Sequence, residues 1–247
     1  MTTRSTALRA LACLDLTDLS DSTSQEEATR LIARGQTPFG PVAAICIWPQ
    51  FVSGAAARLR HSEIRLATVI NFPAGEEDIE RAVDDTRQAL RDGADEIDLV
   101  MPWRALRRGD DALPRAMIEA VAGCLPARHH LKVIIESGEL ADPALIDAAS
   151  RLAIEAGAHF IKTSTGKTAV SATPAAARVM LTAIRDSGKP VGFKASGGIR
   201  TLADAQIYLD LADEIMGPDW AKPDTFRFGA SGLLDVLLGA LNEGAGA

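Results

Sequence analysis

The sequence is poor in cysteine, and it contains no long hydrophobic run. The three cysteines, Cys13, Cys46 and Cys124, are odd in number and have no C-x-x-C spacing. That arrangement fits a reducing cytosol and excludes a disulfide framework. No stretch approaches the roughly eighteen uncharged apolar residues that a membrane helix needs. We therefore expect a cytoplasmic protein with no membrane partner.

Basic residues are also in the minority. The chain of 247 residues has 26 Lys and Arg against 33 Asp and Glu, so its net charge is −7. An acidic chain is a poor partner for nucleic acid or for an anionic membrane, and we expect neither. The apolar stretch at residues 7–14 is short, is interrupted by Arg9 and has no small-residue cleavage site after it, so it does not predict a signal peptide.

Lysine is scarcer still, and its placement is the most informative feature of the chain. Only six of the 26 basic residues are lysines, yet Lys162 and Lys194 each lie inside a short apolar run. Burying an ammonium group costs free energy unless it is paired or loses its proton. Arginine cannot be deprotonated in a protein, whereas lysine can and then becomes an amine nucleophile. Two lysines in apolar strands therefore indicate an enzyme that forms an imine with its substrate.

Apolar runs alternate with helical patterns along the chain. The runs that predict strands cover residues 11–17, 42–48, 65–72, 96–101, 131–137, a segment at Phe160, 191–196 and 227–231. The helical patterns begin near residues 22–27, cover 76–92, 111–123 and 143–156, open at Thr173-Pro174, and cover 201–212 and 232–241. Such alternation predicts a parallel sheet. Eight units in about 250 residues favour an α/β fold of the (β/α)8 TIM-barrel type, with residues 1–247 as a single domain.

An open dinucleotide-binding sheet is the competing fold. It requires a G-x-G-x-x-G motif after the first strand. Residues 14–23 contain no glycine, so this alternative is disfavoured.

Charged residues in the strands are expected to share the barrel lumen. Side chains alternate between the two faces of a strand, so Lys162, Lys194 and Asp98 point inward if their apolar neighbours face the helices. Reactive groups of such barrels lie at the carboxyl ends of the strands. Asp15 and Cys46 are candidates for the same space, although Cys46 taken alone is better explained as a small buried residue.

We expect Lys162 to be the imine-forming amine and Lys194 to be its electrostatic partner. A free lysine has a pKa near 10.4, about 3.4 units too high for a neutral amine at pH 7. A second ammonium about 6 Å away would supply roughly two of those units at an effective dielectric near 20. Burial would supply the rest. A carboxylate opposes this effect, so we expect Asp98 to lie nearer Lys194 than Lys162. The alternative is that these lysines are only buried salt-bridge partners.

Glycine-rich segments after the last two strands predict an anion site. Gly197 and Gly198 follow one strand, and Ser231 and Gly232 follow the next, directly before a helix. Bare backbone N–H groups converge at such loops and bind phosphate. Thr165 and Lys167 are expected to add a hydroxyl and a cation to this site. The alternative is that the glycines merely form tight turns.

Two other motifs are excluded. Gly166-Lys167-Thr168 resembles the end of a P-loop, but Ile161 stands where that motif requires its first glycine. The four histidines, at positions 61, 129, 130 and 159, have no metal-ligand spacing. We expect no metal site.

The segments that carry these residues resemble those of the deoxyribose-phosphate aldolase family, which are class I aldolases, over nearly the whole chain. The matching segments are Asp15-Leu16-Thr17, residues 43–46, Asn71-Phe72-Pro73, Glu96-Ile97-Asp98, residues 132–136, residues 160–167, Gly192-Phe193-Lys194 with Gly197-Gly198, and residues 227–231. The segment at 160–167 is highly specific, whereas the others would be weak alone.

The resemblance implies a lyase that reversibly joins acetaldehyde to D-glyceraldehyde 3-phosphate to give 2-deoxy-D-ribose 5-phosphate. It implies an imine on Lys162, proton transfer by Asp98 and Lys194, and Cys46 near the substrate. It also implies that Asp15 and Thr17 bind the sugar hydroxyls. No cofactor is expected, because the protonated imine is itself the electron sink. Family analogy alone suggests a homodimer.

Two departures from the family pattern concern the phosphate site and the end of the chain. Gly232 stands where some members have a second serine, and residues 242–247 lack the tyrosine that certain relatives use to move a proton. Three alternatives remain open: a Schiff-base aldolase with another substrate, a metal-dependent aldolase, and a non-catalytic barrel that binds sugar phosphates.

Overall fold

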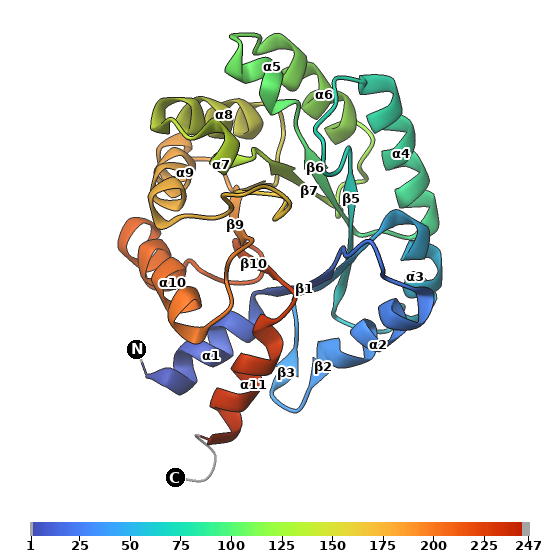
Figure 1. Ribbon diagram of the computed structural model, residues 1–247, viewed down its shortest axis with the longest axis vertical. Coiled ribbons are helices and arrows are strands. Elements are labelled where there is room, and N and C mark those ends of the chain that lie inside the picture. Colours follow the sequence, from blue (N-terminus) through green and yellow to red (C-terminus); the bar gives the residue numbers. More distant parts are fainter. Residues whose placement is uncertain (1, 244–247) are drawn as a thin grey trace.

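Eight parallel strands close into a barrel in the computed structural model, which describes residues 2–243 (Figure 1). The order around the barrel is β1-β10-β9-β8-β7-β6-β5-β4, and β4 pairs with β1 again. The strands are β1 Leu14–Asp18, β4 Ala44–Ile47, β5 Arg65–Ile70, β6 Glu96–Val100, β7 His130–Ile134, β8 Phe160–Lys162, β9 Gly192–Ser196 and β10 Phe226–Ala230. The predicted (β/α)8 fold is confirmed.

Helices surround the barrel on the outside (Figure 1). They are α1 Thr3–Ala12, α2 Gln25–Gly35, α3 Val52–Leu59, α4 Ile79–Asp92, α5 Trp103–Arg107, α6 Ala112–Ala122, α7 Ser137–Leu140, α8 Pro143–Glu155, α9 Pro174–Ser187, α10 Leu202–Met216 and α11 Leu233–Glu243. The 3-10 turn η1 Pro49–Phe51 precedes α3, and β2 Gln36–Thr37 pairs with β3 Gly40–Pro41 in a small antiparallel hairpin. Within residues 2–243, no helix is long and apolar enough to cross a bilayer.

Local capping explains where the helices begin. Ser24 and Glu27 form a capping box at the start of α2, and Thr201 does the same for α10 with Asp204. Thr173 caps α9, and Pro174 occupies its first position, as the sequence predicts. The start predicted for α4 at residue 76 is three residues early. The N–H of Glu76 donates to the Asn71 side chain, so residue 76 belongs to the preceding turn.

The N-terminal segment differs from the prediction. Residues 11 and 12, expected in the first strand, are the end of α1, which packs against α11 and α10. Thr2 caps this helix by accepting a hydrogen bond from the N–H of Ser5. The short helices α3, α5 and α7 were not predicted, because four to eight residues give too little periodicity to be recognised. Residues 244–247, which are part of the segment without tyrosine, lie outside the described residues.

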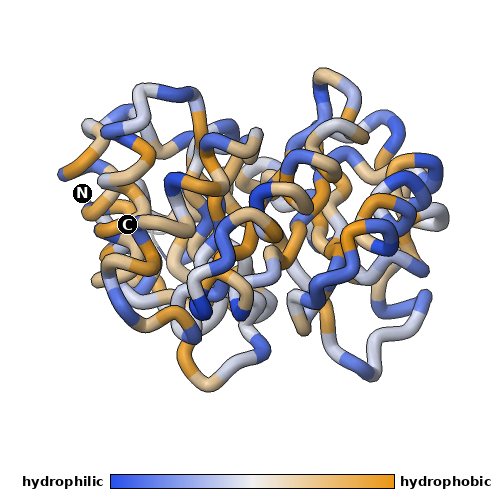
Figure 2. Tube along the Cα trace, turned by 90° about the horizontal axis from the view of Figure 1, so that it is seen from above, coloured by the Kyte–Doolittle hydropathy of each residue, from blue (hydrophilic) through white to orange (hydrophobic). Residues whose placement is uncertain are grey.

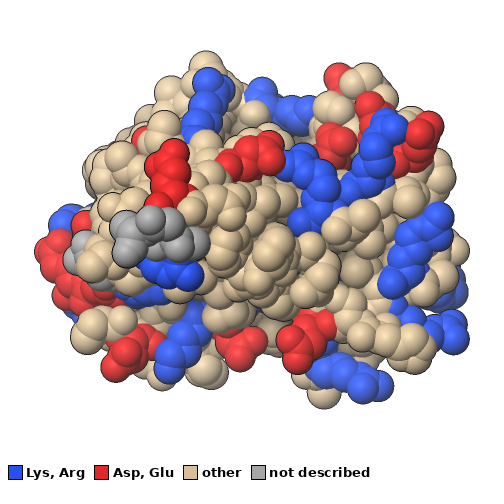
Figure 3. Space-filling view, turned by 90° about the horizontal axis from the view of Figure 1, so that it is seen from below, with Lys and Arg blue, Asp and Glu red and all other residues tan. Residues whose placement is uncertain are grey.

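The apolar core lies between the barrel wall and the helices. Strand residues such as Ile97, Leu99 and Val133 pack there against helix residues such as Met117 and Ile118. Figure 2 shows hydrophobic and hydrophilic residues alternating along the helices, as expected when one helix face is buried. On the surface shown in Figure 3, acidic and basic side chains are interspersed. The lumen is different, because it holds charged groups.

Candidate active site

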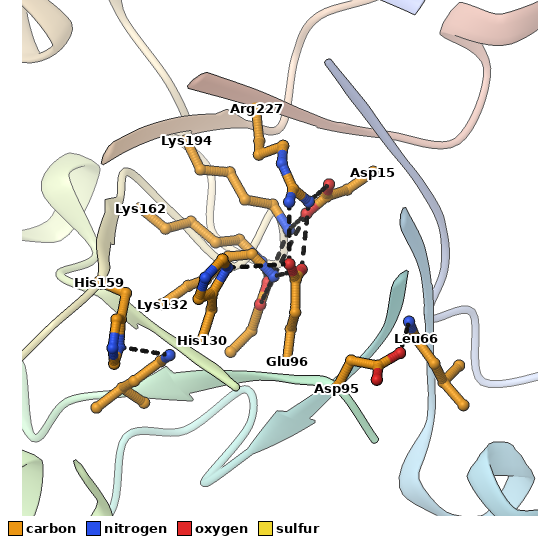
Figure 4. Close-up of polar contacts among 12 residues, drawn as sticks. Asp15, Leu66, Asp95, Glu96, His130, Lys132, His159, Lys162, Lys194 and Arg227 are labelled. Atoms are coloured by element: carbon orange, nitrogen blue, oxygen red, sulfur yellow. Dashed lines mark hydrogen bonds and ion pairs between the residues drawn. The ribbon is translucent and has the colours of Figure 1, made fainter. Parts of the chain in front are cut away.

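Seven charged side chains meet inside the barrel, most of them labelled in Figure 4. They come from six strands, and none is more than 2% exposed. We call these residues the lumen ion cluster: Asp15, Glu96, Asp98, Lys132, Lys162, Lys194 and Arg227. The expectation that Asp98, Lys162 and Lys194 point into the lumen agrees with this geometry.

Asp98 binds all three lysines of the cluster. Its Oδ2 accepts hydrogen bonds from the amines of Lys162 and Lys194, each at 2.8 Å. Its Oδ1 accepts one from Lys132 at 2.9 Å. The expectation that Asp98 lies nearer Lys194 than Lys162 is therefore wrong. The two lysines occupy paired positions on adjacent strands, and both reach the same oxygen of a carboxylate that comes from β6.

Asp15 and Glu96 bind the remaining cations. Asp15 lies 2.5 Å from the amine of Lys194 and 2.6 Å from the guanidinium of Arg227. Glu96 lies 2.5 Å from the amine of Lys132 and 2.9 Å from Arg227. Every cation in the cluster therefore contacts at least one carboxylate.

Glu96, Lys132 and Arg227 were not predicted as site residues. Each lies in a strand with inward phase: Glu96 is two residues before Asp98, and Lys132 interrupts an apolar run. The lone charge in an apolar strand that revealed Lys162 and Lys194 was also present at Lys132. Lysine therefore lies in three apolar strands, and not in the two that the sequence analysis singled out.

The environment separates the lysines by their proton affinity. Burial lowers the pKa of Lys162, and the nearby charge of Lys194 lowers it further, against the opposing effect of Asp98. Burial also opposes charge on Lys194, but Asp15 and Asp98 together raise its pKa above the ordinary value. Asp98 and Glu96 outweigh burial in the same way and raise the pKa of Lys132. Of the three lumen lysines, Lys162 is the one biased toward the neutral amine.

The carboxylates are held in their ionised form. Burial would raise the pKa of Asp98, but the three surrounding lysines hold it well below its ordinary range. Burial likewise opposes the charge of Glu96, and Lys132 and Arg227 hold its pKa well down. Lys194 and Arg227 outweigh burial at Asp15 and lower its pKa. All three carboxylates are therefore anions at neutral pH.

Cys46 belongs to the lumen but not to the ion cluster. It packs in a small apolar group with Leu19, Val69 and partly buried Phe72. Burial raises the pKa of its thiol, so the group is a protonated thiol at neutral pH. The small-residue interpretation fits this position.

The other predicted binding residues line one cavity of about 390 Å³ at the carboxyl ends of the strands. Seven predicted residues share it: Thr17, Thr165, Lys167, Gly197, Gly198, Ser231 and Gly232. Gly229 connects this cavity to the ion cluster. A Cβ at this position would come within 3.0 Å of the Lys194 side chain and 2.7 Å of the Ser196 hydroxyl, so the missing side chain leaves room beside Lys194.

Backbone geometry explains the paired glycines at the cavity. Gly197 and Gly198 have φ angles of +84° and +81°, which L-residues with a side chain rarely adopt. A Cβ at Gly197 would also lie 2.6 Å from Ser171. The turn therefore needs glycine, and both residues line the cavity. The N–H of Gly197 donates to the carbonyl of Gly229 at 3.5 Å.

Side chains at the cavity already have partners within the protein. The amine of Lys167 donates to the carbonyl of Leu19 at 2.7 Å, and the Thr17 hydroxyl donates to the carbonyl of Asp15 at 2.8 Å. The Thr165 hydroxyl donates to Glu136 at 2.7 Å, so its proton is directed away from the cavity. Thr165 is thus a wall residue whose hydroxyl supports the loop.

The histidines lie at the opposite, amino-terminal end of the barrel. His130 stacks on His159 at a ring-centroid distance of 5.4 Å, and its Nδ1 lies 3.4 Å from Glu96. In residues 2–243, no group of three or more His, Cys, Asp or Glu side chains is arranged to hold a metal ion.

Comparison with known proteins gives the class of this barrel. The sequence model described as DeoC/LacD family aldolase matches residues 10–238, and the chain belongs to this family. It is 53% identical over 242 residues to a deoxyribose-phosphate aldolase of Agrobacterium fabrum, covering 98% of this chain and 93% of that protein. The enzyme class predicted from the sequence, an aldolase and hence a lyase, is confirmed.

Solved structures agree with the fold. A protein of Toxoplasma gondii ME49 described as a deoxyribose-phosphate aldolase superposes with a TM-score of 0.89 at 24% identity, covering 98% of this chain and 97% of that one. One of Coccidioides immitis with the same description has a TM-score of 0.83 at 29% identity and covers 97% and 87%. The first likeness supports the barrel, and the second also supports the family assignment.

Proposed function

We propose that this protein reversibly cleaves 2-deoxy-D-ribose 5-phosphate into D-glyceraldehyde 3-phosphate and acetaldehyde through a Schiff base on Lys162, with the chain acting as one domain. The 53% sequence identity to a deoxyribose-phosphate aldolase supports this choice of substrate. The observation that carries the chemistry is the charge balance of the lumen ion cluster.

That balance singles out Lys162. The cluster holds three carboxylates, which are all ionised, and four basic groups. Arg227 cannot lose its proton. Lys132 and Lys194 are each held charged by two carboxylates within 3 Å. Charge neutrality in a buried site then leaves Lys162 as the neutral amine, because an excess buried charge is expensive.

A neutral Lys162 is also correctly arranged for attack. One of its N–H groups donates to Asp98, which leaves the nitrogen lone pair available. Lysine amines are activated as nucleophiles by desolvation and by a neighbouring cation, and both effects are present.

The reaction proceeds by imine formation, cleavage of the C2–C3 bond and hydrolysis. The amine of Lys162 adds to the C1 aldehyde of the open-chain sugar, and water leaves to give a protonated imine. A base takes the proton of the C3 hydroxyl, and the C2–C3 electron pair moves into the imine as that bond breaks. The triose phosphate departs and an enamine remains. Protonation of the enamine carbon and hydrolysis release acetaldehyde and restore the amine.

Asp98 and Lys194 are the proposed proton-transfer groups. Asp98 touches both lysines, so a proton moving from Lys194 to Lys162 or to the substrate passes through a single carboxylate oxygen. We assign the substrate phosphate to the cavity of about 390 Å³ above the cluster. We assign the sugar hydroxyls to Asp15 and Thr17. These residues are two positions apart on β1, which is about 6.6 Å of strand rise, so they span the space between the Lys162 amine and the phosphate cavity.

Borohydride trapping tests the proposal. The protein is incubated with acetaldehyde and borohydride, digested, and mapped by mass spectrometry, while cleavage of 2-deoxyribose 5-phosphate is assayed in parallel. We expect one reduced adduct, on Lys162, and cleavage that is unaffected by chelator. An adduct on Lys167 or Lys194 would contradict the role of Lys162. Absence of cleavage with a Lys162 adduct present would point to a Schiff-base aldolase with another substrate.

A further inference from the structure

The loop between β8 and α9, residues 163–173, carries Lys167 to the cavity, and a carboxylate buried behind this loop holds it in place. That carboxylate belongs to Glu136, which lies two residues after β7 and directly before α7, and it is 0% exposed. We propose that Glu136 is a positioning residue which fixes the Thr165–Lys167 segment and thereby sets the preference for phosphorylated over unphosphorylated substrates. The inference rests on the proposed function and concerns one of its binding groups.

The contacts of Glu136 are directed at the loop. The N–H of Thr165 lies 3.2 and 3.3 Å from its two oxygens, and the Thr165 hydroxyl donates to it at 2.7 Å. The Thr168 hydroxyl lies 3.4 Å away. The Thr165 hydroxyl in turn accepts the N–H of Lys167 at 3.1 Å. A continuous hydrogen-bonded path therefore runs from the carboxylate to the backbone of Lys167.

A close backbone approach attaches the same loop a second time. A Cβ on Gly138 would come within 2.0 Å of the Val170 carbonyl oxygen, so the far part of the loop lies directly on the start of α7. On the other side of the cavity, the amine of Lys167 donates to Leu19 at 2.7 Å. Lys167 is thus held at both its backbone and its amine. Glu136 fixes the backbone position through the Thr165 hydroxyl.

Glu136 makes these contacts at a cost to the fold. Its backbone is in the left-handed region, with φ 54° and ψ 57°, which is uncommon for a residue other than glycine. Burial raises the pKa of its carboxyl despite the bonds from Thr165. A carboxyl with a raised pKa in the folded state destabilises the fold when it is ionised. The backbone conformation and the burial of Glu136 both act against the fold, whereas its hydrogen bonds are directed at the loop.

The test compares substrates with and without the phosphate. Steady-state cleavage of 2-deoxyribose 5-phosphate and of 2-deoxyribose is measured for the full-length protein, Glu136→Gln and Thr165→Val. We expect both variants to raise KM for the phosphorylated sugar roughly tenfold, the order of effect of a lost bond to a charged group, with kcat within about twofold. On 2-deoxyribose, kcat/KM should stay within about twofold. The ratio of the two kcat/KM values therefore falls.

The matched control is Glu139→Gln, which removes a carboxylate three residues further along α7. It should leave the ratio unchanged. Thermal unfolding of each variant identifies general damage, which would lower kcat/KM on both substrates equally and would overturn the inference. An unchanged or lowered KM for the phosphorylated sugar in Glu136→Gln would also overturn it. If the unmodified protein cleaves neither sugar, the proposed function itself has failed.

Discussion

The side-chain nitrogens of Lys162 and Lys194 bind the same oxygen, Oδ2 of Asp98, each at 2.8 Å. The two amines therefore lie no further apart than twice that distance. Lys194 has a second carboxylate partner, Asp15, at 2.5 Å. This asymmetry separates the proton affinities of the two amines: the pKa of Lys194, which has two anionic partners, is raised, whereas burial and the charge of Lys194 lower the pKa of Lys162.

Replacing Lys194 by leucine should abolish most activity through an effect on Lys162. Without that cation, three carboxylates face Lys132, Arg227 and Lys162, so Lys162 becomes the balancing ammonium and its pKa rises. We expect turnover at pH 7 to fall roughly 10² to 10⁴-fold. The acid limb of the pH–rate profile should move to higher pH, which steady-state assays across pH will show.

The control for this variant is Lys189→Leu, which removes a lysine outside the lumen. It should leave the profile in place. An unchanged acid limb in Lys194→Leu would mean that the two amines are not electrostatically coupled.

Asp98→Asn should separate imine formation from proton transfer. The amide keeps the size of the side chain but removes a negative charge, so the pKa of Lys162 falls further and the amine stays nucleophilic. Borohydride trapping with acetaldehyde should still label Lys162, whereas turnover should drop by about 10² to 10⁴-fold. Loss of both trapping and turnover would assign Asp98 a role in forming the imine.

Lys132→Met should test whether Lys132 balances the charges of Glu96 and Asp98 in the lumen ion cluster. Lys132 lies 2.5 Å from Glu96 and 2.9 Å from Asp98, and removing one partner of a buried pair costs about 3–5 kcal/mol. Urea unfolding should show a loss of that order. The loss in the double variant with Glu96→Gln should be smaller than the sum of the two single losses by about 0.5–3 kcal/mol, the coupling energy of the pair. Strictly additive losses would exclude the interaction.

The barrel should lose stability in acid. In the folded state the pKa values of Asp15, Glu96 and Asp98 are lowered, so each contributes stability that is fully present above its ordinary pKa of about 4. That contribution is lost as the pH falls below about 4 toward the folded-state values. The free energy of unfolding, measured in urea between pH 6 and pH 3, should therefore fall steeply with acid, and less so in Asp98→Asn. Equal slopes would contradict the assignment.

Much of the fold could be predicted from the sequence, because eight strand patterns alternate with seven helical patterns. Strand existence and order were predictable, and so were helix starts with strong caps such as Ser24 and Thr173. Element ends were less predictable. Glu76 reads as a helical residue, yet its N–H bonds to Asn71 in a turn that only tertiary contacts define.

A site residue was predictable where the sequence of its own strand marked it, as a charged residue inside an apolar run. Lys162, Lys194 and Asp98 each stand out in an apolar run, and their alternation gives the inward face. Their distances depend on the barrel's register and diameter, so the sequence could not show that Asp98 bridges both lysines equally. Arg227 was missed because arginine is the common surface cation of this chain, and Glu136 because its role depends on a loop that follows another strand.

The most direct test of the central claim is the pH dependence of trapping at Lys162. The rate at which acetaldehyde and borohydride modify this residue is measured by mass spectrometry across pH. The account predicts that Lys162 reaches half of its maximal reactivity below pH 10.4, the ordinary lysine value. A half-point at or above 10.4 would show that Lys162 is an ammonium in the resting protein, and the account would be wrong.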